Sequence, residues 1–325
     1  MNDTIEAKGL FKQFDIKRSP LAPKQKATVV DNVDIALTPG ETLGLAGESG
    51  SGKSTVAKLL AGLLPPTSGE IFFNGKNISA FSTAEHKQFR KSVQMIFQDP
   101  FSSLNPKMKV GDIIGEPLLI HKTVPKKLIK ENVLKLMNRV GLSPDDFNRY
   151  PHQFSGGQRQ RIGIARALSL SPSIIIADEP VSALDISIQA QIINLLNDLQ
   201  KESGLSYLFI SHDLHVIRHI SDRIAIMYLG RIVEIGKSED IFLRTLHPYT
   251  EALNKAVPNI NSSKSDETFL LNSDIPSPIA PPEGCHFHPR CPYAKDICKS
   301  KKPELIEKEK GHKAACHFSN EIFKH

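Results

Sequence analysis

The feature that most constrains this chain is a glycine-rich segment with an apolar run on each side. Gly47–Thr55 reads GESGSGKST, which fits the pattern G-x-x-x-x-G-K-[ST]. The short apolar run before it predicts a strand, and the helical spacing of Thr55–Ala61 predicts a helix. Strand, glycine loop and helix in this order predict an α/β fold with a phosphate-binding loop. A chance glycine turn is the alternative, and both flanks argue against it.

The loop residues have chemistry suited to a nucleoside triphosphate. Glycines let the backbone curl so that successive N–H groups point toward an anion. We expect Lys53 to reach the β- and γ-phosphates, and the Ser54 hydroxyl to bind Mg²⁺. The residues expected to contact the nucleotide here are Gly47, Ser49, Gly50, Gly52, Lys53, Ser54 and Thr55.

A second segment supplies acidic side chains. Ser173–Glu179 reads SIIIADE, and an apolar run without alternation is typical of a strand buried on both faces of a parallel sheet. Such sheets bind ligands at the carboxyl ends of their strands. We expect Asp178 to join the Mg²⁺ shell and Glu179 to orient and polarise the attacking water. The alternative is an acidic pair that only ends a strand.

Four further motifs occur in a fixed order and carry a family resemblance. Gln98 lies in FQDP, Ser155–Arg161 reads SGGQRQR, Ser182–Asp185 reads SALD, and His212 lies in ISHD. With the loop and the acidic strand, these motifs make the chain resemble ATP-binding cassette (ABC) transporter ATPases. The resemblance implies an ATPase that binds ATP and Mg²⁺. Its fold would have a mixed sheet core, an antiparallel β subdomain and an inserted α-helical subdomain.

The resemblance also implies a role for each motif residue. Gln98 would contact the metal and water and sense the membrane partner, and His212 would contact the γ-phosphate. Ser155 and Gly157 would touch the γ-phosphate bound by an opposite subunit, and Asp185 would position that subunit's loop. The dimer would therefore close on two nucleotides. A weaker match is Phe14, either the aromatic ring that stacks on adenine or a core side chain.

Other segments narrow the resemblance to the oligopeptide/dipeptide importer ATPases. They are Phe97–Pro106, Tyr150–Phe154, His247–Thr250 and a cysteine-bearing tail. Asp178–Asp185 looks more like the F-type subunit than its D-type sister. This implies a D-type ATPase partner, two transmembrane permeases, an indirect extracytoplasmic solute-binding protein, and a place at the cytoplasmic face of the inner membrane. The segment Phe101–Ile120 would dock on a permease.

A soluble ABC ATPase of DNA repair or translation is the alternative function. Such proteins usually carry tandem cassettes, coiled coils or long basic inserts, and the sequence displays none of them. The net charge of +6 is mild, and residues 285–325 contribute nine Lys/Arg against five Asp/Glu. Acids are interspersed throughout, so we expect a solvated face and no nucleic-acid partner. No apolar run approaches the roughly 18 residues of a membrane span, and no signal peptide is expected.

The chain is expected to hold one cassette followed by an extension. We predict an ABC ATPase domain over 1–256, with its helical subdomain over about 99–170. Residues 257–283, rich in Ser, Asn and Pro, are predicted to be a linker, and 284–325 a C-terminal cysteine-rich extension.

The four cysteines all lie in this extension, at Cys285, Cys291, Cys298 and Cys316. A reducing cytosol disfavours disulfides, and thiols gathered in a short tail that is expected to lack a core favour a metal. The gaps are wider than usual zinc knuckles, so a [4Fe–4S] cluster ranks first, as some resembling ATPases carry one. Zinc, helped by nearby histidines, and free thiols remain open. Those histidines are His286, His288, His312 and His317.

Overall fold

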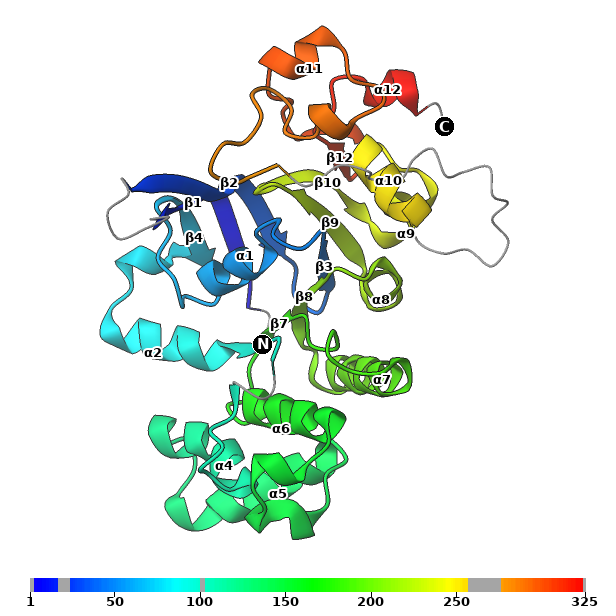
Figure 1. The fold of residues 1–325 in the computed structure, drawn as a ribbon. Helices are drawn as coiled ribbons and strands as arrows, with labels where there is room; N and C mark the ends of the chain where they lie inside the picture. The colour runs from blue at the N-terminus through cyan, green and yellow to red at the C-terminus, as the bar shows by residue number, and fades with distance from the viewer. Residues whose placement is uncertain (1–2, 17–23, 100–102, 257–275, 324–325) are drawn as a thin grey trace. The chain divides into compact units, whose positions relative to one another are not determined.

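The protein is described by a computed structural model that covers residues 3–16, 24–99, 103–256 and 276–323. Its elements are drawn in Figure 1. The chain divides into two compact units, each assembled from several stretches. Unit 1 comprises Met1–Ile5, Leu37–Glu41 and Phe73–Ile210, and unit 2 comprises Glu6–Ala36, Thr42–Phe72 and Ser211–His325. Within the described ranges, no helix is both long enough and apolar enough to cross a bilayer.

Unit 1 contains parallel strands with helices. The strand β7 (Ile174–Asp178) lies between β6 (Val93–Ile96) and β8 (Ser206–Ser211), and both pairings are parallel. Every residue of β7 is buried, as expected for an apolar run that does not alternate. The longer helices of this unit are α2 (Thr83–Ser92), α4 (Val110–His121), α5 (Ile129–Arg139), α6 (Gly156–Leu168) and α7 (Ile186–Ser203).

Short elements connect them. Lys126–Leu128 forms the 3₁₀ turn η2 directly before α5. The remaining short elements of unit 1 are β5 (Lys76–Asn77), η1 (Ile78–Ala80), η3 (Pro144–Asn148) and η4 (Pro151–Gln153). α4 packs against α5 and α6, and α5 also contacts α6, so the three helices labelled in Figure 1 form one group.

Unit 2 contains a mixed sheet. The strand β3 (Thr42–Ala46) pairs in parallel with β9 (Arg223–Tyr228), and β9 pairs antiparallel with β10 (Arg231–Lys237). Three strands of a smaller sheet also belong here, in the order β2 (Gln25–Leu37), β1 (Ile5–Ile16) and β4 (Ser68–Phe73). The predicted α/β class, with its mixed sheet, second sheet and helical insertion, is confirmed. The helices of this unit are α1 (Lys53–Leu60), α8 (Leu214–Ile220), α9 (Ser238–Leu243), α10 (Pro248–Ala256), η6 (His288–Arg290), α11 (Asp296–Ser300) and α12 (Ser319–Ile322).

The C-terminal extension is built onto the mixed sheet of unit 2. Its strand β12 (His312–Ala314) pairs antiparallel with β10 and with β11 (Ile306–Glu309). Phe287 is buried, with its ring centroid 5.3 Å from that of Tyr228 and 5.4 Å from that of Tyr249. The expectation that this tail lacks a core was therefore wrong, because the extension shares the core of unit 2.

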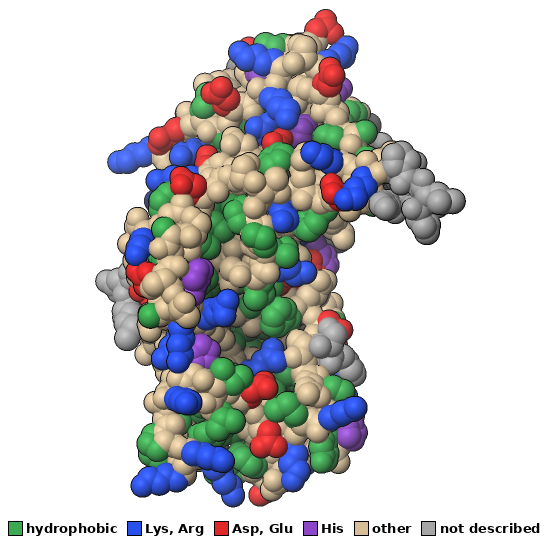
Figure 2. All heavy atoms as spheres, turned by 90° about the vertical axis from the view of Figure 1, so that its left-hand side faces the viewer, with side chains coloured by type: hydrophobic (Ala, Val, Ile, Leu, Met, Phe, Trp, Pro, Cys, Tyr) green, Lys and Arg blue, Asp and Glu red, His purple; other side chains and the backbone are tan. Residues whose placement is uncertain are grey.

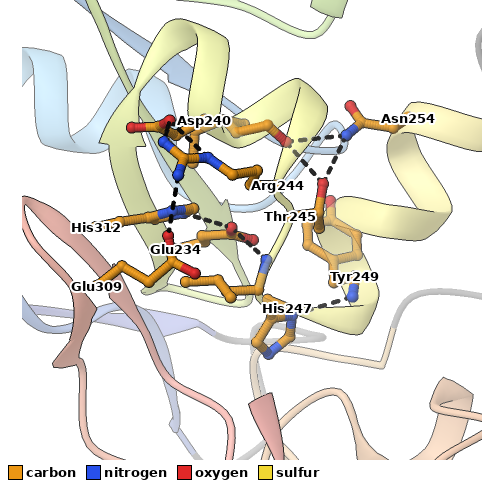
Figure 3. A network of polar contacts seen from close by, with 11 residues as sticks. Glu234, Asp240, Arg244, Thr245, His247, Tyr249, Asn254, Glu309 and His312 are labelled. Atoms are coloured by element: carbon orange, nitrogen blue, oxygen red, sulfur yellow. Dashed lines mark hydrogen bonds and ion pairs between the residues drawn. The ribbon is translucent and has the colours of Figure 1, made fainter. Parts of the chain in front are cut away.

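A buried polar network fixes the same junction (Figure 3). His312 Nε2 lies 2.8 Å from Oε1 of Glu234, and the Leu246 N–H donates to the same oxygen at 2.7 Å. Both side chains of the His312–Glu234 pair are almost completely buried. Breaking such a pair would leave one polar group buried and unsatisfied, so β12 is firmly attached to β10.

Charged side chains are mixed on the face that Figure 2 shows. Asp and Glu side chains are scattered among more numerous Lys and Arg side chains over this face. This distribution agrees with the solvated surface expected from the mild net charge of +6.

Candidate nucleotide site

The glycine-rich loop connects the buried strand β3 to the helix α1 within unit 2. Gly47 and Gly52 have φ values of 148° and 106°, which L side chains rarely adopt. A Cβ on Gly47 would lie 2.1 Å from the Met227 carbonyl oxygen, and one on Gly52 would lie 2.4 Å from that of Val29. Both positions therefore require glycine, because the loop runs against neighbouring backbone.

The loop ends at the start of α1. Gly52 is the N-cap and, being glycine, brings no side chain to the first turn, and the N-terminus of a helix favours an anion. Lys53 is buried, and its Nζ donates to the carbonyl oxygens of Gly47 and Glu48 at 2.7 and 2.9 Å. Of the other predicted contacts, Ser49 and Gly50 are exposed, and Ser54 and Thr55 are half-buried in the first turn.

The acidic end of β7 lies in unit 1 together with Gln98. Asp178 and Glu179 are both buried, and Gln98 Nε2 donates to Oε2 of Glu179 at 3.0 Å. Glu179 has a φ of 46°, an uncommon value for a residue with a side chain. Its N–H donates to the Ile210 carbonyl on the neighbouring strand at 3.0 Å. Strained backbone of this kind is concentrated at functional sites, so this φ makes Glu179 a candidate for a functional role.

The SGGQ segment opens α6 in the same unit. Ser155 is the N-cap and forms a capping box with Gln158. Gly157 is buried, and a Cβ there would lie 2.5 Å from Cγ2 of Ile188 on α7. Asp185 caps α7, and its hydrogen bond from the Ile188 N–H lowers the pKa of the carboxyl. The two segments predicted to face a second subunit therefore lie beside one another.

Two other predicted residues lie in unit 2. Phe14 is half-buried on β1, and Lys12 Nζ lies 5.2 Å from its ring centroid, so its ring is not a deep core side chain. His212 is exposed and immediately follows β8. Its neighbour Asp213 caps α8 through hydrogen bonds from the N–H groups of the first turn.

The four cysteines carry free thiols. Burial, with smaller contributions from the charges of the other cysteines, raises the pKa of Cys285 to about 11 and that of Cys291 to about 12. The four sulfurs are therefore within electrostatic range of one another. Still, among the described residues no group of three or more His, Cys, Asp or Glu side chains is arranged to hold a metal ion. The predicted metal site is not formed in this structure.

Ring nitrogens of the four nearby histidines already contact protein oxygens. Beyond the His312–Glu234 pair, Nδ1 of His286 lies 3.2 Å from the Leu229 carbonyl oxygen and Nδ1 of His288 lies 2.9 Å from that of Cys285. His317 Nε2 lies 2.9 Å from the Lys301 carbonyl oxygen.

Two charged residues beside the loop were missed by the sequence reasoning. Glu48 lies inside the loop, and Arg290 of the extension forms an ion pair with it at 2.7 Å. The available signal was the carboxylate itself, because an acid within a phosphate-binding loop calls for a compensating cation. Its partner is 242 residues away in sequence and has no motif that points to it.

Comparison with protein families gives two matches. Residues 30–182 match the ABC transporter family, and residues 233–298 match the oligopeptide/dipeptide transporter C-terminal region. The oligopeptide transport ATP-binding protein AppF of Bacillus subtilis is 51% identical over 319 residues, covering 97% of both chains. The dipeptide transport ATP-binding protein DppF of Haemophilus influenzae is 46% identical over 312 residues, covering 96% of this chain and 95% of that protein.

Solved structures match the cassette part. The dimeric post-hydrolysis structure of the ATP-binding cassette MJ0796 with ADP and Pi gives a TM-score of 0.64 at 28% identity. It covers 72% of this chain and 98% of that chain. CbiO1 of Clostridium perfringens, part of the ABC transporter complex cbiONQ, gives a TM-score of 0.61 at 26% identity. This match covers 73% of this chain and 90% of that chain.

Proposed function

Because the chain belongs to the ABC transporter family, among its oligopeptide and dipeptide transport ATP-binding proteins, we propose that it is the F-type ATPase subunit of a peptide importer. It binds and hydrolyses ATP, and closure of an ATPase dimer on the nucleotides drives transport. The observation that carries the ATPase part of this proposal is the buried Glu179, held at a strained φ and bonded by Gln98. An acid fixed in this way suits a group that orients water.

The residues divide the chemistry between them. Lys53 and the N–H groups of the loop bind the phosphates, as their position at the start of α1 permits. Ser54, Gln98 and Asp178 would supply the oxygen ligands that Mg²⁺ prefers. The ion supplies charge neutralisation at the phosphates when bound. Glu179 accepts a proton from the attacking water, and His212 contacts the γ-phosphate. Phe14 is assigned to adenine stacking.

The same proposal includes a second ATPase subunit, of the D type. Ser155 and Gly157 complete the partner's phosphate site, and Asp185 positions the partner's loop. An apolar residue at this face supports a protein contact, because Ile186, next to Asp185, is 85% exposed. MJ0796 is dimeric in the solved structure, which supports a closed pair as the working form.

Two permeases complete the transporter, with a solute-binding protein acting outside the membrane. We assign the segment Phe101–Ile120 to permease docking; its first two residues lie outside the described ranges. Support comes from Leu119 and Ile120 at the end of α4, which are 52% and 64% exposed. Docking would place the chain at the cytoplasmic face of the inner membrane. The proposed domain bounds are 1–256 for the cassette, 257–283 for the linker and 284–325 for the extension.

The substitution Glu179→Gln tests the catalytic assignment. We expect it to keep ATP binding and to lower the ATPase rate by about a hundredfold or more, because the amide cannot accept the proton of water. Lys53→Ala is the comparison variant and should lose ATP binding. Full ATP turnover by Glu179→Gln would refute the role of Glu179.

We also propose that the four cysteines hold a [4Fe–4S] cluster, with zinc as the alternative metal. Support comes from the mutual electrostatic influence of the four cysteines, which requires that they lie near one another. No step of ATP hydrolysis is assigned to the metal. Anaerobic purification followed by iron, sulfide and zinc analysis is the test, with Cys298→Ser as control. Absence of all three elements from the wild-type chain would leave free thiols as the answer.

A further inference from the structure

Arg290 of the C-terminal extension makes a two-pronged ion pair with Glu48 of the glycine loop. Nη1 donates to Oε2 at 2.7 Å, and Nη2 donates to Oε1 at 3.1 Å. The Arg290 side chain is only 3% exposed, and the Tyr228 hydroxyl lies 3.4 Å from Nη1. Paired contacts between guanidinium and carboxylate are strong and directional, so this pair fixes the Glu48 side chain.

The backbone of Glu48 is fixed as well. Its N–H donates to the Tyr249 hydroxyl at 2.9 Å, and its carbonyl oxygen accepts from Lys53 Nζ at the same distance. Tyr249 is fully buried, with its ring centroid 4.6 Å from that of Tyr228. Glu48 is thus held at its side chain, its N–H and its carbonyl, and the last contact leads directly to the phosphate-binding lysine.

The backbone around Arg290 is held in place by packed residues. It ends η6, three residues after the buried Phe287. Downstream, β12 pairs with β10, and the His312–Glu234 contact closes the same junction. All these residues belong to unit 2. Packed residues both before and after Arg290 in the sequence therefore hold its guanidinium against the loop.

The charges around the loop give this pair a function. A carboxylate in a loop that receives a polyphosphate repels the ligand unless a cation compensates it, since a partly buried site screens charges poorly. Glu48 is 21% exposed, so solvent screens it only in part. Arg290 brings one positive charge to this carboxylate and holds its two oxygens in one orientation.

We propose that Arg290 is a positioning residue of the nucleotide site, which neutralises Glu48 and fixes the loop for the phosphates of a nucleoside triphosphate. The C-terminal extension is then part of the ATP-binding apparatus of its own subunit. This inference rests on the proposed assignment of Gly47–Thr55 as the ATP site.

A double-substitution cycle tests it in the full-length chain. The dissociation constants of ATP and ADP are measured by calorimetry for Arg290→Gln, Glu48→Gln and the double variant, each in a Glu179→Gln background to stop turnover. We expect Arg290→Gln to weaken ATP binding by on the order of tenfold, because Glu48 is left without its cation. The loss should be smaller for ADP, which carries less negative charge.

The double variant separates charge compensation from simple tethering. Both Arg290→Gln and the double variant lose the ion pair, but only the double variant also loses the repelling carboxylate. We expect it to regain ATP affinity close to that of the Glu179→Gln background. No recovery, or an equal loss for ATP and ADP, would overturn the inference.

Lys53→Ala separates failure of this inference from failure of the proposed site. If Arg290→Gln binds ATP normally while Lys53→Ala does not, the inference is wrong and the site assignment stands. If Lys53→Ala also binds ATP normally, the assignment of the glycine loop itself is wrong.

Discussion

Two glycines of the helix α6 differ in the space around them, and this difference predicts opposite effects of alanine. A Cβ on Gly157 would lie 2.5 Å from a methyl group of Ile188, whereas nothing lies within 4 Å of the same position on Gly163. We expect Gly157→Ala to lower the free energy of unfolding by about 1–3 kcal/mol through overpacking. Gly163→Ala should raise it by about 0.5–1 kcal/mol, because alanine favours the helix.

Denaturant unfolding of both variants beside the wild type gives the measurement. Ile188→Val removes a methylene while keeping the β-branch, so it should leave the effect of Gly157→Ala largely in place. Equal stabilities of Gly157→Ala and Gly163→Ala would show that α6 and α7 approach less closely than the structure has them.

At the scale of single residues, the sequence predicted backbone geometry well where a local motif encodes it. The loop glycines have the positive φ values and close contacts that only glycine tolerates, and these follow from a short pattern. The pairing of Glu48 with Arg290 was beyond such reasoning, because it depends on two segments 242 residues apart meeting in the fold. The left-handed φ of Glu179 was also unpredictable, since glutamate seldom adopts it.

The helix α10 gives a pH-dependent prediction at the scale of elements. His247 precedes this helix and is fully buried, and its Nδ1 accepts from the Tyr249 N–H at 3.0 Å. Burial lowers the pKa of His247 to about 3, from an ordinary value of 6.5. The folded protein therefore keeps this ring neutral, whereas the unfolded chain takes up a proton near pH 6.5.

The sign of the effect follows from this difference. The contribution of His247 to stability is complete above pH 6.5 and is lost as the pH falls from 6.5 toward 3, by up to about 1.4 kcal/mol per pH unit. Between pH 7 and 5.5, His247→Gln should remove about 1 kcal/mol of the wild-type decrease in unfolding free energy. His152→Gln, at an exposed position, should keep the wild-type slope. A slope unchanged in His247→Gln would contradict the assignment.

Elements with a clear hydrophobic pattern in the sequence were predicted. Elements that depend on pairing with a distant strand were not. The apolar run of β7 is a buried strand because its residues suit no other environment. β12 has only three residues, and it is a strand because β10 supplies hydrogen bonds and Glu234 supplies a partner for His312. Nothing within so short a segment specifies that pairing, so the extension was wrongly taken to lack a core.

At the scale of the whole molecule, the proposal requires other chains. The described helices include none that could span a bilayer, and the apolar side chains of Leu119, Ile120 and Ile186 are left exposed. Surface leucine and isoleucine in such positions are suited to protein contacts. A single cassette also has only one SGGQ segment, which in the proposed mechanism serves the nucleotide of another subunit.

A pull-down with the Glu179→Gln variant tests this arrangement. ATP should trap the closed dimer in this variant, since binding is kept and hydrolysis is slowed. After detergent solubilisation and mass spectrometry, we expect two multi-span permeases and a second ATPase, all in greater yield than with Lys53→Ala. Recovery of a homodimer together with permeases would show only that the second ATPase is not a D-type subunit. Recovery of repair or ribosomal proteins without permeases would overturn the importer while leaving the ATPase chemistry in place.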